Sequence, residues 1–173
     1  MKKDKKIQIE TLTIIILVTL ILTIGIMIFN SLTNKRKIEN FEKQSELVVG
    51  AAKNAYIAFS KEGLDNYLVT STDGTTRAMC ITLKGLEKNN LLDQDLSNWD
   101  GYVIIEMGEK TTYKLWLTNK KYIVKGIEEQ DLKKLKINDN LKKYDKEELT
   151  DDVRSSFTSS KKYESKCINE KIE

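Results

Sequence analysis

Residues Thr11–Phe29 have the sequence TLTIIILVTLILTIGIMIF, an apolar run without a charged side chain. An α-helix rises about 1.5 Å per residue, so the run would extend about 28 Å, close to the roughly 30 Å hydrocarbon core of a bilayer. The sequence therefore predicts a transmembrane helix over residues 11–30 of a single-pass membrane protein. Two alternatives stay open, a buried core helix and a cleaved signal sequence. The run is longer than the apolar part of a typical signal sequence, and no small-residue cleavage pattern follows it.

The composition limits the rest of the chain to one modest domain. Beyond the head and the apolar run, the 173 residues leave about 140, which is enough for one hydrophobic core. The 29 Lys and Arg exceed the 26 Asp and Glu by only three, too few to indicate a nucleic-acid partner. The absence of His excludes a His-based catalytic triad and the usual zinc and iron sites. We therefore expect no enzyme, no cofactor and no bound metal.

The charges that flank the apolar run, together with the two cysteines, predict its orientation. Residues 1–10 form a short basic head with four lysines, against three cations in Lys35–Lys37 after the run. The positive-inside rule therefore favours a cytoplasmic head by one charge. A disulfide between Cys80 and Cys167 would agree with this, because disulfides persist outside the cytosol. We expect a cytoplasmic N-terminus, an extracellular domain and this disulfide; two free thiols in a cytosolic domain are the alternative.

A one-sided apolar pattern continues from the span through residues 31–60. Its positions advance by three and four residues, which places them on one face of a helix. This packing seam, in which Ser45 is in register, consists of Ile38, Phe41, Val48, Ala52, Ala55 and Phe59. No Pro interrupts it, so we expect one continuous helix whose amphipathic second half packs against a domain. Two helices joined by a hinge near residues 31–35 are the alternative.

Residues 61–138 are predicted to form the α+β domain that packs on this seam. A linker rich in Gly, Ser, Thr and Asp occupies residues 61–77, and Thr82 is placed to cap a short helix. Three β-branched and aromatic runs with short polar turns follow over residues 102–126. They predict a three-stranded antiparallel meander, with the Tyr113 face of the middle strand against the long helix.

The sequence patterns that predict secondary structure become weaker towards the C-terminus. A short helix is expected over residues 128–136, and a marginal, highly charged helix over residues 141–153. Residues 139–173 are expected to be a polar tail that Cys167 ties back to the domain. On the middle strand of the meander, Trp116 faces away from the expected core, so it is placed under a loop, at a subunit contact, or in solvent.

This order of features resembles that of a type IV pilin or a type II secretion pseudopilin, and most closely that of pilin-like proteins of Gram-positive bacteria. The segment Cys80–Val103 resembles their cysteine-led short helix, loop and Gly-Tyr strand entry, and Cys167 resembles their C-terminal cysteine. Glu10 matches the family's acidic residue just inside the apolar run. Lys5 and Lys6 stand where the family's processing site has Gly and Phe, so the site is degenerate. The resemblance implies a pilin-like fold that assembles through its apolar helix.

Two polar constellations have alternative interpretations. In the family, the acid that Glu10 matches pairs with the amino terminus of a neighbouring subunit. An interfacial carboxylate that pairs with Lys6 one turn away is the other interpretation. Asp93 and Asp95 match the start of a calcium-binding loop, but Ile104 stands where that loop has a bidentate Glu. An irregular calcium site near these two aspartates stays open.

The sequence thus leads to two hypotheses about function. The first is a pilin-like or pseudopilin subunit, or an accessory protein, of a type IV pilus or type II secretion-type filament. Its partners would be the lipid bilayer, other pilin-like subunits and the assembly machinery. The second is a single-pass, membrane-anchored extracellular binding or sensor module that does not polymerise. Both are non-enzymatic.

Overall fold

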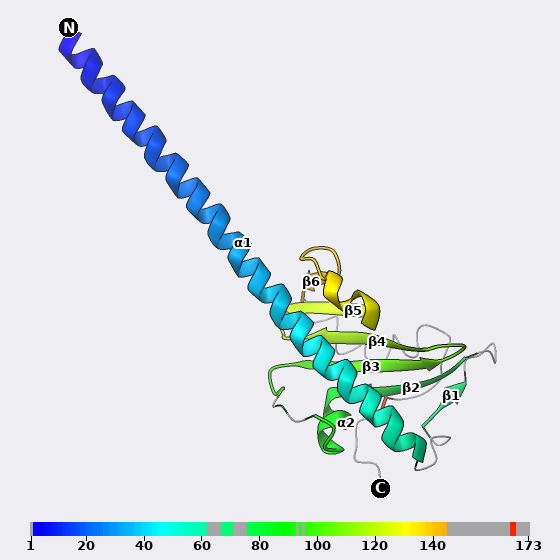
Figure 1. Cartoon of the computed structure of the whole chain (residues 1–173). Helices are drawn as coiled ribbons and strands as arrows, with labels where there is room; N and C mark the ends of the chain where they lie inside the picture. The colour runs from blue at the N-terminus through cyan, green and yellow to red at the C-terminus, as the bar shows by residue number, and fades with distance from the viewer. Residues whose placement is uncertain are drawn as a thin grey trace. The chain divides into compact units, whose positions relative to one another are not determined.

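A long N-terminal helix and an antiparallel sheet make an α+β fold, as the sequence predicted. The computed structural model describes residues 2–61, 67–70, 76–92, 94, 96–144 and 167–168, with the backbone alone for residues 2–10 and 69–70. The contacts within the chain divide it into two compact units, Met1–Glu39 and Asn40–Glu173. The elements in chain order are α1 (Lys2–Lys61), β1 (Val69–Thr70), β2 (Arg77–Thr82), α2 (Leu83–Lys88), β3 (Asp100–Met107), β4 (Thr111–Thr118), β5 (Tyr122–Glu128), the 3-10 helix η2 (Glu129–Lys134) and β6 (Leu141–Lys143) (Figure 1).

The first unit consists of the N-terminal part of α1. The backbone is helical throughout α1, including residues 31–35, where a hinge was the alternative. The hydroxyls of Thr19, Thr23 and Thr33 donate to backbone carbonyls three or four residues earlier, at 2.8–3.0 Å. These three threonines therefore satisfy their hydroxyl groups within the helix itself, as an apolar surrounding requires.

The sheet of the second unit has six antiparallel strands in the order β1-β2-β3-β4-β5-β6, so each strand lies beside its neighbour in the chain (Figure 1). The predicted meander is confirmed as β3, β4 and β5. The β3–β4 ladder runs without interruption from Asp100 opposite Thr118 to Met107 opposite Thr111. The β4–β5 ladder contains an irregularity between Leu115 and Leu117.

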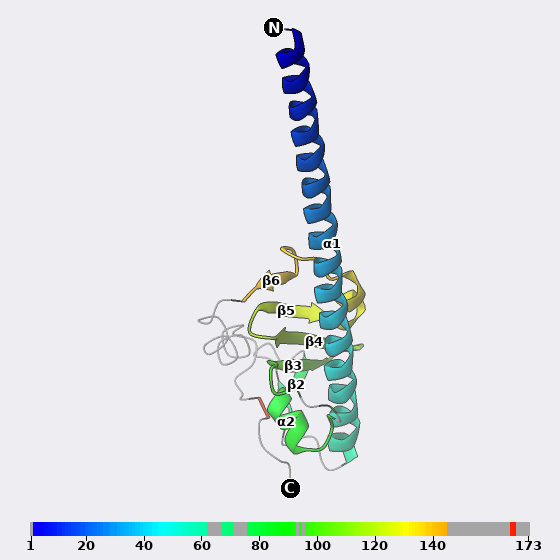
Figure 2. The same cartoon turned by 90° about the vertical axis from the view of Figure 1, so that its left-hand side faces the viewer.

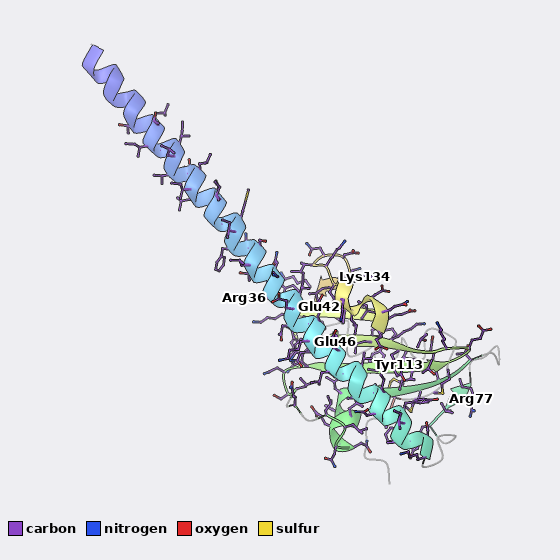
Figure 3. All side chains as sticks on the ribbon, viewed as in Figure 1. Arg36, Glu42, Glu46, Arg77, Tyr113 and Lys134 are labelled. Atoms are coloured by element: carbon purple, nitrogen blue, oxygen red, sulfur yellow. A yellow bond between two sulfur atoms is a disulfide. The ribbon has the colours of Figure 1, made fainter. Side chains whose placement is uncertain are left out.

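One face of the sheet forms the main core with the part of α1 that follows Asn40 (Figure 2). On β4, Tyr113 points towards α1, where Lys53 lies over its ring with Nζ 5.3 Å from the centroid (Figure 3). The next inward residues along β4, Leu115 and Leu117, are buried. The Tyr113 face was predicted to meet the long helix, and the structure confirms it.

The other face of the sheet carries a smaller cluster of buried side chains. The cluster contains Ala78, Cys80, Tyr102 and Ile104, and the partly buried Trp116 and Cys167 pack against it. Trp116 and Tyr102 stand opposite each other in the β3–β4 ladder, and their rings are stacked with centroids 4.9 Å apart. The Trp116 ring also lies against Gly126, where a Cβ would come within 3.0 Å of ring atom Cζ2. The φ of Gly126 is 59°, a backbone conformation that favours glycine. Trp116 is therefore partly buried within its own chain.

Three sequence-based assignments are wrong. The linker expected over residues 61–77 contains strand β1, and β2, which includes Cys80, begins at its last residue, Arg77. The helix expected over residues 141–153 starts instead as strand β6, and residues 145–153 lie outside the described residues. Because β6 pairs with β5, the sheet extends past position 138, where the polar tail was expected to begin.

The two short helical elements agree with the sequence. Thr82 caps α2, and the backbone N–H of Gly85 donates to its Oγ1 at 3.0 Å. The short helix expected over residues 128–136 is the 3-10 helix η2, where Leu132 is buried. α2 lies against β2 and β3, and η2 lies against β4 and β5.

Candidate functional site: the apolar helix segment and the disulfide clasp

The apolar segment of α1 is not covered by the chain. From Leu12 to Leu32, the large apolar side chains expose between 48% and 70% of their surface. An 18-residue window here has a mean hydropathy of 3.0 with no residue buried, and it is the one candidate membrane span within the described ranges. Such a surface is stable in lipid or against other apolar helices, since exposing it to water costs about 25 cal/mol for each Å². The segment is long and apolar enough to cross a membrane.

Polar residues end the apolar segment abruptly. Lys35 and Glu39, one turn apart on α1, form an exposed ion pair with Nζ and Oε1 3.8 Å apart. Lys37 donates to the side chain of Asn34 at 3.5 Å, and Thr33 bonds back to the helix. At the other end, Glu10 is described only by its helical backbone, so its predicted pairing lies outside the described side chains. The apolar surface is therefore bounded at least on its C-terminal side.

The packing seam coincides with the buried face of α1 in the second unit. Phe41, Val48, Ala52, Ala55 and Phe59 each expose 3% or less of their surface. Ser45, in register with them, is also buried. The remaining seam residue, Ile38, lies in the first unit, ahead of Asn40 where the folded unit begins.

The buried face of α1 is wider than the predicted seam. Val49 and Ala51 are buried as well, and the seam did not include them. Val49 follows Ser45 by four residues, so it continues a second diagonal on the same side of the helix. This spacing of four residues from Ser45 is the sequence signal that would have identified Val49 as buried. Ala51, Ala52 and Ala55 together give the sheet a flat, small-residue surface to approach.

Aromatic contacts fix the two ends of this face. The rings of Phe41 and Trp99 meet edge to face with centroids 4.8 Å apart, and those of Phe59 and Tyr67 are 5.9 Å apart. Trp99 lies in the loop before β3, and Tyr67 in the segment before β1. Both loops are therefore held against the same helix.

Ion pairs connect α1 to η2 along a shallow groove. Lys53 pairs with Glu129, and Glu46 pairs with Lys133 at 3.8 Å. The groove has a volume of about 610 Å³ and is lined by Glu46, Val49, Gly50, Lys53, Glu129, Gln130, Leu132 and Lys133. Beside it, burial raises the pKa of Tyr113, and the neighbouring Tyr56 and Glu129 raise it further. Exposed pairs of this kind contribute about 0–1 kcal/mol each, so they orient the helix more than they hold it.

A disulfide joins the C-terminal segment to the sheet. Cys80 on β2 and Cys167 are bonded with their Cα atoms 4.5 Å apart and 87 positions apart in sequence. The pairing predicted from the sequence is present. Beside it, Ile168 forms a parallel β-bridge with Ile81. Cys167 and Ile168 thus lie against the sheet as a short added strand.

Metal ligands are the remaining candidate feature of the site. Among the residues that the structure describes, no three His, Cys, Asp or Glu side chains gather to hold a metal ion. Asp93 and Asp95, the proposed calcium ligands, lie outside the described residues. What the chain presents is an uncovered apolar helix segment together with a helix-backed sheet closed by a disulfide. Comparisons with protein-family models, with curated proteins and with solved structures each found no match.

Proposed function

We propose that this protein is a pilin-like or pseudopilin-type subunit, or an accessory protein, of a type IV pilus or type II secretion-type filament. It would assemble through the apolar segment of α1 and display the sheet unit outside the membrane. The observation that carries the proposal is the exposure of this segment, where each large apolar side chain from Leu12 to Leu32 leaves about half or more of its surface uncovered. A filament supplies that cover from neighbouring helices, and a membrane supplies it from lipid before assembly.

The architecture of the folded unit supports the same proposal. A pilin-like subunit needs a helix that is apolar all round where it meets its neighbours and one-sided where it carries its own domain. α1 has both characters, with an uncovered segment that ends at Leu32 and a buried face that begins at Phe41. The Cys80–Cys167 disulfide supports placement of this domain on the extracellular side, because such bonds persist there.

A membrane-anchored binding or sensor module that stays monomeric is the second candidate. One observation favours it: Lys5 and Lys6 occupy the positions where a pilin-like processing site has Gly and Phe. An uncut head leaves two lysines and no free amino terminus beside Glu10. In this alternative, lipid alone covers the apolar segment.

Cysteine crosslinking within the membrane distinguishes the two candidates. The native cysteines are bonded to each other, so in Val18→Cys/Leu20→Cys the new thiols are the reactive ones. Positions 18 and 20 lie about 200° apart around the helix, on opposite sides. A filament is expected to give a ladder of dimers, trimers and larger species on oxidation. The single variant Val18→Cys is the matched control, because one thiol per chain stops the products at dimers.

The outcome is decisive in either direction when the N-terminus is also measured. Intact-mass spectrometry of the protein from native membranes reports whether the head before Glu10 has been removed. A ladder supports the filament. Monomers alone from the double variant, with a head that begins at Met1, would reject it and support the anchored module.

A further inference from the structure

Two different segments cover the outer edge of β2. β1 pairs with Arg77 and Ala78 at one end of this edge. Cys167–Ile168 covers the other end, where Ile168 bridges Ile81 in parallel orientation. The six strands pair only antiparallel to one another, so this contact is of a different kind. An uncovered edge is a template for strand addition, and here the C-terminal segment serves as the added strand.

The contacts of this added strand are mostly backbone contacts. The N–H of Ile168 donates to the carbonyl of Cys80 at 2.8 Å, and the N–H of Thr82 donates to the carbonyl of Ile168 at 3.0 Å. The hydroxyl of Thr82 donates to the same carbonyl at 3.2 Å. Gly85 leaves the space that this carbonyl needs, since a Cβ at position 85 would collide with it. The edge therefore recognises an extended backbone, as in β-strand addition.

The two halves of this contact belong to separate parts of the chain. On the β2 side the contact uses atoms of residues 80–85, and on the other side it uses atoms of Cys167 and Ile168, with hydrogen bonds donated in both directions. Cys167 and Ile168 are only partly buried, so the site opens at the surface. Twenty-two residues of sequence separate Tyr144 from Cys167. A connection of that length reaches at most about 75 Å, far enough to serve a neighbouring copy.

We propose that the Cys80–Gly85 edge is a strand-acceptor site that takes Cys167–Ile168 from a second copy of this chain as well as from its own. Two copies would then exchange C-terminal segments and become linked by disulfides. The proposal uses the folded unit alone, so it does not depend on whether the apolar helices form a filament. The partner strand provides the same backbone N–H, the same carbonyl and the same sulfur as the chain's own strand.

The exchange needs no net oxidant. A Cys167 thiolate from a second copy attacks Sγ of Cys80, and the Cys80–Cys167 bond within the first chain breaks as the bond between the chains forms. The displaced Cys167 leaves as a thiolate and attacks the next disulfide. One thiolate is consumed and one is released at each step, so a trace of free thiol is sufficient.

Complementary single-cysteine variants test the site in the full-length protein. A donor chain with Cys80→Ser and an acceptor chain with Cys167→Ser are purified in detergent and mixed with oxidised glutathione. The glutathione accepts two electrons and two protons from the thiols and becomes two reduced molecules. The expected product on a non-reducing gel is a heterodimer joined by a Cys80–Cys167 bond. An acceptor that lacks both native cysteines and carries Lys143→Cys measures random collision, and should give at least tenfold less product.

Variants of the strand itself separate edge pairing from simple proximity of two thiols. Ile168→Pro in the donor removes the N–H that bonds to Cys80 and should lower the yield about tenfold, whereas Ile168→Val keeps it and should not. In the acceptor, Gly85→Ala should lower the yield, whereas Gly108→Ala should not, because the nearest atom to a Cβ at position 108 would be the Lys110 carbonyl oxygen at 4.0 Å, an ordinary contact. Equal yields from the Pro and Val donors, or from the Lys143→Cys acceptor, would overturn the proposal.

The unmodified protein provides a second measurement that does not depend on a variant that folds. Chains grown in ordinary and in nitrogen-15 medium are mixed in detergent with a trace of reduced glutathione and then digested with trypsin. Peptides 78–84 and 167–171 remain linked by the disulfide. Exchange should produce linked peptides with one light and one heavy partner. Their absence after hours of incubation would contradict the proposal.

Discussion

Residues 11–30 and residues 40–61 belong to the same helix and have opposite surroundings. In the first segment, Ile24 exposes 48% of its surface and Phe29 exposes 69%. In the second, Phe41 exposes 1% and Val48 exposes none. Both segments are α-helical without a Pro, so the backbone does not distinguish them. The two segments differ instead in how their apolar residues are arranged around the helix axis.

This difference shows that an apolar pattern indicates the kind of cover a helix needs. A segment that is apolar on every side needs a surrounding medium, such as lipid or a ring of helices. A segment that is apolar on one side needs a single packed partner, which this chain provides from its own sheet. If so, changes in one segment should leave the stability of the other unaffected.

Removal of the disulfide should have the largest effect, and only on the folded unit. The double variant Cys80→Ser/Cys167→Ser opens a loop of 87 residues, which should lower the free energy of unfolding by about 4–5 kcal/mol on the chain-entropy model. Urea unfolding in detergent, followed by tryptophan fluorescence, measures this loss. The circular dichroism of the helical span should persist after the sheet has unfolded. Simultaneous loss of both signals would contradict the separation of the two segments.

Two phenylalanines on the same helix provide a matched pair for the next largest effect. Phe41→Ala removes a buried ring that contacts Trp99 and should destabilise the folded unit by about 3–5 kcal/mol. Phe29→Ala removes a ring of the same size from an exposed position and should leave the unfolding transition unchanged. The same urea titration measures both variants. A large effect of Phe29→Ala on this transition would show that the folded unit depends on the apolar segment.

A charge in the apolar segment should act on membrane insertion and not on folding. Val18→Lys places an ammonium group near the middle of the span, at a cost of about 2.5–3.5 kcal/mol for insertion. The protein should then appear in the soluble fraction after alkaline extraction of membranes. Asn30→Lys, at the end of the span, is the control and should remain in the membrane. Equal extraction of both variants would mean that lipid does not cover residue 18.

Much of the fold follows from patterns that the sequence displays openly. The helix, the β3–β5 meander, the Thr82 cap and the disulfide each have a local signal, either a periodicity, a turn, a capping residue or a pair of cysteines. Strand β2 was missed for a physical reason. Four consecutive residues, Ala78–Ile81, are buried because both faces of the sheet are covered there, so apolar and polar residues do not alternate.

The remaining errors come from tertiary contacts that sequence periodicity does not report. β6 has only three residues, two of them lysines, and it forms because β5 offers it a partner. The contact of Ile168 with the edge of β2 joins positions 87 residues apart and depends on the space above Gly85. Even so, the buried seam residues from Phe41 to Phe59 were found from their spacing, because helical periodicity is longer and more regular than any strand signal in this chain.

The smallest expected effect lies where the amphipathic half of α1 meets the sheet. Burial raises the pKa of Tyr113, and the neighbouring Tyr56 and Glu129 add to this. The folded protein therefore holds the phenolic proton more strongly than the unfolded chain does. This contribution to stability is fully present below the unfolded pKa of about 10 and is lost as the pH rises through the folded pKa. Tyr113→Phe should remove this part of the alkaline loss, because phenylalanine has no proton to release.

A comparison of the unmodified protein with Tyr113→Phe across pH isolates the Tyr113 hydroxyl. Urea unfolding at several values between about pH 8 and 11 gives the free energy for each protein, and their difference cancels the other groups that titrate in that range. The difference should be constant up to about pH 9.5 and then move in favour of the Phe variant. A difference that stays constant to pH 11 would mean that α1 does not desolvate Tyr113. The amphipathic half of the helix would then cover the sheet less closely than the burial of Ala52 and Ala55 indicates.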